Sequence, residues 1–197
     1  MSKYFAIEGN IYQVSSKAYE LLILNVCFIV TAIPLVTIGS SLTTCYQLLQ
    51  ERQPGNQSIT VVNYLKYFKQ NLVKGSQVFI LNVICLLAGT GLVIISPLFL
   101  RLVLLLFLAG LILLFQSLYP LLPIMGCSLK DGLKISSYLL LKHTILVISA
   151  FMYFIISFLI LVFFQKLFIF WLCFGFSIPL FGSSQCYRTI FKKLNIL

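Results

Sequence analysis

Residues 76–122 read SQVFILNVICLLAGTGLVIISPLFLRLVLLLFLAGLILLFQSLYPLL, and this stretch decides the fold. It holds two apolar blocks, 76–95 and 102–122, each with the ~20 residues that a helix needs to cross the ~30 Å hydrocarbon core of a bilayer. Between the blocks, Pro97 removes a backbone donor and Arg101 resists burial in hydrocarbon. The stretch therefore predicts two membrane-spanning helices joined by a tight turn.

The composition of the whole chain agrees with this interpretation. Of its 197 residues, 60% are hydrophobic and only 9% are charged, whereas soluble domains carry roughly 25% charged residues. We therefore expect an all-α, polytopic transmembrane bundle that forms a single membrane domain over 1–197, multi-pass in the cell membrane. The apolar blocks predict five spans, at about 21–42, 76–95, 102–122, 144–164 and 167–186.

The basic residues predict the orientation, because positively charged loops near span ends are retained in the cytoplasm. The chain has 14 Lys and Arg residues. With five spans, four basic residues lie on one side of the membrane and ten lie on the other. The four are Lys3, Lys17, Arg101 and Lys166. We therefore expect the N-terminus outside and the C-terminus in the cytoplasm. A re-entrant turn at Pro34 would instead invert the downstream assignment.

Two basic segments at the expected cytoplasmic face, about 53–75 and 126–143, have apolar residues at helical spacing. Both are expected to lie in the membrane interface. They either cover the end of the bundle, or they dock a partner protein or bind anionic lipid headgroups. The candidate docking or lipid-binding residues are Lys66, Lys69, Lys74, Lys130, Lys134 and Lys142.

A related sequence closes three of the expected spans, at Pro34–Gly39, Pro123–Gly126 and Pro179–Gly182, and small residues follow each glycine. Proline frees a backbone carbonyl, and glycine with small residues lets helices approach closely. The motif predicts either a kink at a helix crossing or a broken helix that lines a substrate path. The candidate packing or path-lining residues are Asn25, Pro34, Gly39, Ser40, Ser41, Asn82, Pro123, Gly126, Pro179, Gly182 and Ser183.

The sequence offers little chemistry. His143 is the only histidine, and none of the four acids falls well inside an expected span, which disfavours ion-coupled transport. The six cysteines occur singly, so they indicate neither a metal site nor a disulfide framework. We expect no catalytic residues, no metal and no cofactor. Nucleic-acid recognition is not expected, because the basic residues are confined to membrane faces.

Some stretches are similar to a known family. Residues 22–49 read LILNVCFIVTAIPLVTIGSSLTTCYQLL, with the pair Leu24-Asn25, the IPLVTIG core and a following tyrosine. Together with FKQN at 68–71 and FGFSIPLFGSSQCYRTIFKK at 174–193, this stretch resembles the YesL-like family of bacterial integral membrane proteins of unknown function. The chain departs from the family in its short N-terminus and in lacking the aromatic residue often found after the Leu-Asn pair.

The resemblance implies a five-span protein of a group found beside carbohydrate ABC transporters and glycoside-degrading enzymes in Gram-positive bacteria. It carries over no catalytic residue. Our first hypothesis is a non-catalytic accessory or regulatory partner of a carbohydrate ABC transporter, which would bind the permease subunits. The alternative is a small carrier or channel for a small solute, formed by a homo-oligomer.

Overall fold

A computed structural model of the chain describes residues 10–51, 59–126, 128–164, 166 and 168–194. These residues form helices, with no strand among them. The helices are α1 (Asn10–Ala32), the short 3-10 helix η1 (Leu35–Thr37), α2 (Ile38–Glu51), α3 (Val61–Ile95), α4 (Leu98–Met125), α5 (Leu129–Lys142), α6 (Thr144–Phe163), α7 (Phe168–Phe174) and α8 (Ser177–Lys193). The predicted all-α fold is confirmed.

Four helices are long and apolar enough to cross a membrane, namely α1 over Ser15–Ala32, α3, α4 and α6. The pair α7 and α8 would add a fifth span if it counts as one broken element, since its two axes differ by 43°. The described residues thus match a polytopic helical bundle with four to five spans. The predicted orientation of this bundle stays a prediction.

The expected span 21–42, whose continuity through Pro34 the sequence leaves open, is divided in the structure. Helix α1 starts earlier, at Asn10, and ends at Ala32, and α2 begins only at Ile38. Pro34 explains the break, because proline donates no hydrogen bond and disfavours the helical conformation of the residue before it. Helix α2 has 14 residues and is about 21 Å long. It is therefore too short to cross the bilayer by itself.

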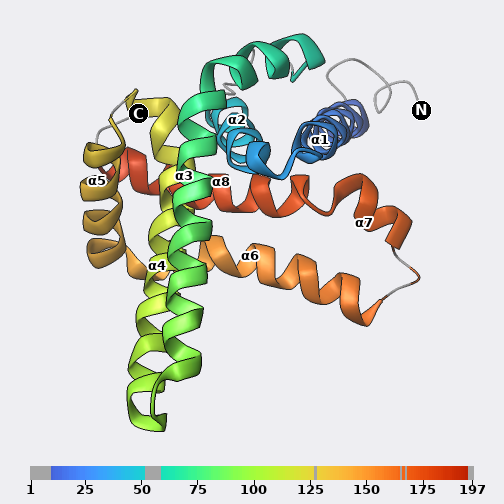
Figure 1. Ribbon diagram of the computed structural model, residues 1–197. Helices are drawn as coiled ribbons and strands as arrows, with labels where there is room; N and C mark the ends of the chain where they lie inside the picture. Colours follow the sequence, from blue (N-terminus) through green and yellow to red (C-terminus); the bar gives the residue numbers. More distant parts are fainter. Residues whose placement is uncertain (1–9, 52–58, 127, 165, 167, 195–197) are drawn as a thin grey trace.

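The segment 53–75 and the span 76–95 were expected as separate elements, yet the described residues 61–95 form the single helix α3, and 53–58 lie outside the described residues. Figure 1 shows the first turns of α3, at the top of the view, running across the direction of its long remainder. The first part, 61–75, contains three lysines, whereas 76–95 contains no charged residue. Gly75 and Ser76 lie where they meet, and such a pair is a common site of helix bending.

The second half of the chain agrees more closely with the predicted segments. Helix α4 contains the expected span 102–122, α5 fills most of the segment 126–143, and α6 matches the span 144–164. The expected fifth span, 167–186, is again broken, between α7 and α8. In Figure 1, the α3–α4 hairpin runs vertically, whereas α6, α7 and α8 run across it.

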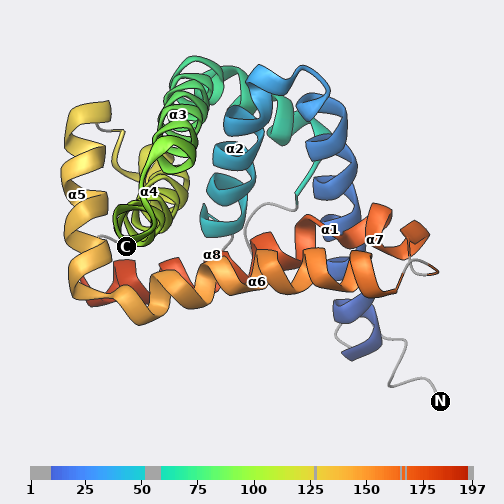
Figure 2. The same ribbon diagram turned by 60° about the horizontal axis from the view of Figure 1, so that its bottom comes forward.

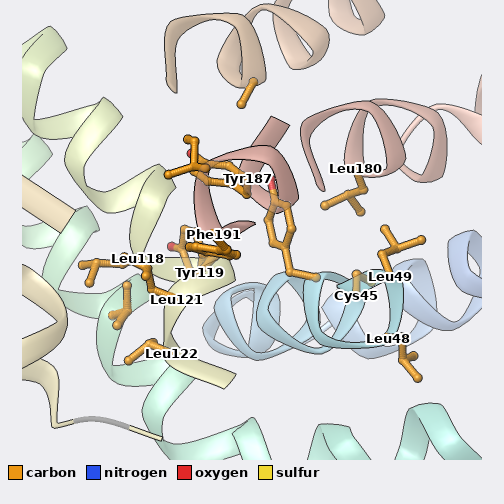
Figure 3. Packing of buried hydrophobic residues seen from close by; sticks show 14 of the residues in the cluster. Cys45, Leu48, Leu49, Leu118, Tyr119, Leu121, Leu122, Leu180, Tyr187 and Phe191 are labelled. Atoms are coloured by element: carbon orange, nitrogen blue, oxygen red, sulfur yellow. The ribbon is translucent and has the colours of Figure 1, made fainter. Parts of the chain in front are cut away.

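Helix α2 lies at the centre of the molecule. Figure 2 shows it between α1 and α3, with α8 and α6 passing at one end. All its residues from Gly39 to Gln50 are buried except Leu42, which is half-buried. Figure 3 shows how α2 contributes Cys45 and Leu49 to the buried cluster, opposite Leu180 of α8. The core is thus built around a helix that is not one of the candidate membrane spans.

Three hydroxyl groups of α2 fit this buried position because they bond to carbonyls one turn earlier in the chain. The hydroxyl of Thr43 donates to the carbonyl of Gly39 at 2.8 Å, and that of Thr44 donates to Ser40 at 2.7 Å. Ser41 does the same to Thr37 at 3.0 Å. Such bonds satisfy hydroxyl groups without a partner helix. Helix α2 can therefore be both polar in sequence and fully enclosed.

Candidate functional site

A buried cluster of polar side chains joins α2, α4 and α8. The Tyr46 hydroxyl lies 2.9 Å from the Ser183 hydroxyl, and the Gln116 side-chain nitrogen donates to the same tyrosine oxygen at 3.3 Å. Tyr46 is completely buried, and burial raises the pKa of its hydroxyl well above the usual range. The hydroxyl therefore stays protonated and acts as a hydrogen-bonding group, not as an acid.

The first and third copies of the Pro-Gly motif meet at this cluster. Tyr187 packs edge-on against Tyr46, with ring centroids 6.0 Å apart and planes at 89°. Both tyrosines follow a cysteine shortly after the glycine and serine residues of their motif. The side-chain oxygen of Tyr187 is buried and has no hydrogen-bond partner in the structure. The pair therefore combines one fully used hydroxyl with one unused hydroxyl.

The two hydroxyls predict opposite results for the same substitution. Tyr46→Phe should lower the free energy of unfolding by about 1 kcal/mol, because Ser183 and Gln116 each lose a hydrogen-bond partner. Tyr187→Phe should leave the stability unchanged or raise it, because it removes a buried polar group without a bond. Unfolding in mixed micelles, followed by circular dichroism, measures both. Equal losses in the two variants would contradict this account of the cluster.

Asn25 of α1 bridges the break between α7 and α8. Its side-chain nitrogen donates to the carbonyl of Leu172 at 2.7 Å, near the end of α7. Its side-chain oxygen accepts from the backbone N–H groups of Phe176 and Ser177, at 3.1 Å each. Asn25 is fully buried. A broken helix exposes backbone groups of this kind, and here one amide side chain satisfies three of them.

The break between α1 and α2 is also satisfied from within the chain. The carbonyl of Pro34 accepts from the backbone N–H of Thr37 at 2.7 Å and from its hydroxyl at 2.6 Å. The Thr31 hydroxyl lies 2.9 Å from that of Ser41 and 2.7 Å from that of Tyr64. The hydroxyl groups of α1, α2 and α3 thus form a second buried polar contact beside this break.

Gly39 and Gly75 let α2 and α3 touch backbone to backbone. A Cβ atom on Gly75 would lie 2.5 Å from Cα and 2.8 Å from N of Ser40, and one on Gly39 would clash with the carbonyl oxygen of Gly75. The Ser40 hydroxyl donates to the carbonyl of Leu72 at 2.8 Å and lies 2.9 Å from the hydroxyl of Ser76. This combination of small residues and interhelical hydrogen bonds is typical of close helix packing in membranes.

The other candidate packing residues differ in how closely they are packed. Pro179 is buried in the first turn of α8, and Gly182 packs against the ring of Tyr153, where a Cβ atom would approach to 2.8 Å. Pro34 is exposed, and Asn82 is half-buried with a side-chain oxygen that has no partner. Pro123 lies within the last turns of α4.

Gly126 differs from the glycines of the first and third motifs. It ends α4 with a φ of 57°, in the left-handed conformation that glycine adopts readily, and its N–H donates to the carbonyl of Leu122. No atom lies within 4 Å of the position that its Cβ would take. The middle motif is therefore a helix cap, whereas the first and third pack against other helices.

All six candidate docking lysines are exposed. The ammonium group of Lys74 donates to the carbonyl of Gly126 at 3.1 Å, so Lys74 lies beside the end of α4, just before α5 begins. At the other end of α5, Lys142 donates to the Tyr138 hydroxyl at 2.8 Å. The contact between the two basic segments is thus the bond from Lys74 to Gly126.

The acidic residues need a correction. The expectation that none falls well inside a span depended on a first span beginning at residue 21. The apolar window of α1, Ser15–Ala32, includes Glu20, whose side chain is only 7% exposed. Within the part of the chain that the structure describes, no three His, Cys, Asp or Glu side chains gather as metal ligands would.

One sequence comparison finds a family that matches part of the chain. Residues 21–96 match the family model described as "Protein of unknown function, DUF624". The match covers α1 from residue 21, α2 and α3, and thus includes Asn25 and the contact between Gly39 and Gly75. No curated protein matches the chain, and no solved structure does.

The candidate residues drawn from the sequence leave out several that the structure places in these contacts. Tyr46, Gln116 and Tyr187 form the central polar cluster, and Gly75 with Ser76 completes the contact between α2 and α3. The repeated Cys-Tyr pair after the first and third motifs was the available signal for the two tyrosines. A small pair, Gly75-Ser76, at the boundary between a basic segment and an apolar block was the signal for the helix contact.

Proposed function

We propose that this chain is a non-catalytic integral membrane protein that acts as an accessory or regulatory partner of a carbohydrate ABC transporter. Its helices support membrane insertion, since four are long and apolar enough to cross a bilayer. The transporter is suggested by the resemblance of residues 22–49 and 174–193 to a family found beside such systems. Backbone groups at the helix breaks are already hydrogen-bonded within the chain, and this favours an accessory role over transport by the chain itself.

The state of the helix breaks carries the argument. Carriers with broken helices bind substrates and ions through the backbone groups that the break leaves free. At the break between α7 and α8, the side chain of Asn25 already bonds to Leu172, Phe176 and Ser177. At the break after Ala32, Thr37 bonds to the carbonyl of Pro34. Both breaks therefore serve the packing of the chain.

The exposed lysines provide the surface for a partner. Lys66, Lys69 and Lys74 lie on α3, and Lys74 bonds to Gly126 at the end of α4, just before α5 and Lys130. A positive surface of this kind attracts an acidic segment of another protein and also anionic lipid headgroups. We assign the first interaction to the permease subunits.

The test is purification of the tagged protein in mild detergent at native expression, with quantitative mass spectrometry of the associated proteins. Recovery of permease subunits in a fixed proportion is expected. The variant with Lys66, Lys69 and Lys74 changed to glutamate should recover them about tenfold less, because an exposed charge pair contributes up to about 1 kcal/mol and three are reversed.

Two controls make this test specific. Reversal of Lys192 and Lys193 alters the charge of another exposed segment, at the end of α8, and should leave the association intact. Labelling of single cysteines on both sides of the membrane must show that insertion is unchanged. Undiminished association of the α3 variant would remove the lysines of α3 from the proposed interface.

A small carrier or channel, formed by a homo-oligomer, is the second candidate. One observation favours it: Glu20 is buried within an apolar helix that could span the membrane, and buried carboxylates in such helices commonly serve ion or proton paths. Vesicles containing the purified protein should then show proton or solute flux that Glu20→Gln abolishes. If vesicles with the wild type, vesicles with the variant and empty vesicles all show the same flux, this candidate is rejected.

A further inference from the structure

An apolar pocket of about 130 Å³ lies between α6 and the break that separates α7 from α8. Tyr153, Ser157 and Ile160 form the α6 wall, and Trp171 with Gly175 lines the opposite side. Figure 2 shows α6 beside α7 and α8 along this region. The pocket lies beside this break, where the chain turns at Gly175, and a Cβ atom on Gly175 would clash with the carbonyl oxygen of Trp171, so glycine lets the indole pack against the turn.

The polar atoms of Ser157, Trp171 and Gly175 at the pocket are already bonded to each other. The Ser157 hydroxyl donates to the carbonyl of Gly175 at 2.7 Å. The indole nitrogen of Trp171 donates to the carbonyl of Ser157 at 3.1 Å, and it lies 3.2 Å from the hydroxyl of the same residue. A polar ligand would find no free partner among these groups. The walls thus select a ligand made of hydrocarbon.

The rim of the pocket faces away from the bundle. Ile156 is 53% exposed and Ile178 is 49% exposed, and both line the pocket. Helix α6 is one of the four candidate spans, and α7 with α8 forms the bent pair that would be the fifth. In a bilayer, this rim therefore contacts acyl chains directly, and these chains are the surrounding solvent.

We propose that the pocket binds the end of an acyl chain of a bilayer lipid. Its volume is close to that of an apolar protein cavity of ~150 Å³ that binds benzene. It accepts the end of a hydrocarbon chain and is too small for a headgroup. The lipid chain would fill the space beside the helix break, so that the break needs neither water nor a side chain of its own to close it.

Trp171 provides a direct probe, because it is the only tryptophan of the chain and it lines the pocket. The full-length protein is placed in phosphatidylcholine vesicles with and without bromine atoms near the ends of the acyl chains. Bromine quenches tryptophan fluorescence on contact, so we expect strong quenching of the wild type. Weak quenching of the wild type, as a second copy covering the pocket would produce, overturns the proposal.

Variants separate binding in the pocket from contact at its outside. Ile160→Phe and Ile178→Phe add volume from opposite walls, and each should reduce the quenching by about half as the pocket fills. Ile155→Phe is the matched control on α6, at a residue that is 36% exposed and does not line the pocket. It should leave the quenching as in the wild type. Equal quenching in all four proteins, or equal loss in all three variants, overturns the proposal.

A second measurement needs no substitution. A lipid with a photoactivated diazirine near its chain end is mixed into vesicles of the unmodified protein, and the labelled residues are mapped by mass spectrometry. Label should concentrate on the pocket residues of α6, Tyr153 and Ser157 among them, above the level on the exposed face of the α3–α4 hairpin. Labelling of that hairpin equal to that of the pocket would contradict specific binding.

Discussion

Replacing Gly75 with alanine should separate α2 from α3 and lower the free energy of unfolding by about 3 kcal/mol, at the upper end of what overpacking costs. The new Cβ would lie 2.5 Å from Cα and 2.8 Å from N of Ser40, and 2.9 Å from the carbonyl oxygen of Gly39. These are backbone atoms, so no side-chain rotation can make room. The hydrogen bonds of Ser40 to Leu72 and Ser76 would be lost as the helices move apart.

Gly91 supplies the matched control, because it lies in the same helix and no atom is within 4 Å of its Cβ position. Gly91→Ala should be neutral or should stabilise the protein by up to about 1 kcal/mol, as expected from helix propensity. Unfolding of both variants in mixed micelles measures the difference, and the fraction of monodisperse protein after purification supports it. Similar stability of the two variants would show that the contact between α2 and α3 is not as close as described.

The second large effect is expected at Asn25. Asn25→Leu keeps the approximate size of the side chain but leaves the carbonyl of Leu172 and the N–H groups of Phe176 and Ser177 without their partner. Each unsatisfied buried group costs about 1–3 kcal/mol, although hydrogen bonds between helices in membranes contribute less on average. A loss of about 3 kcal/mol in the free energy of unfolding is the expected result.

The same substitution at Asn82 tests whether the position or the amide matters. Asn82 is half-buried, its side chain bonds only to the Tyr119 hydroxyl among the interactions described, and its side-chain oxygen has no hydrogen-bond partner. Asn82→Leu should therefore cost less than about 1 kcal/mol. Hydrogen exchange of the amides of Phe176 and Ser177 gives a local readout, since it should accelerate in the Asn25 variant alone. Equal losses of stability in the two variants, with unchanged exchange, would remove Asn25 from its role at the break.

Local sequence predicts the apolar helices well, because their length and hydropathy are properties of short stretches. The blocks 102–122 and 144–164 correspond to α4 and α6 for this reason. Pro34 also marks a break by its own chemistry. The same reasoning failed for Pro179, which lies in the first turn of α8, where a helix N–H has no partner within the helix. The chain breaks before it, at Gly175 and Phe176.

The central contacts could not be predicted from local sequence. Asn25 bonds to residues about 150 positions further along, as the separation of 151 to Phe176 shows. Helix α2 presents serine, threonine and glutamine residues, so its sequence favours a surface position. It is buried because α1, α3, α4 and α8 surround it, and because three of its hydroxyls bond to carbonyls one turn earlier in the chain. Only the assembled helices reveal this arrangement.

The distance along the chain between Tyr46 and Ser183 has a consequence for biogenesis. The two residues are 137 positions apart, so a ribosome needs roughly ten seconds to reach Ser183 after it has made Tyr46. During this interval, α2 is present without one of the helices that enclose it, and its polar side chains must be sheltered by α1, α3 and α4 or by the insertion machinery. Release of the newly made protein from that machinery should therefore depend on the arrival of α8.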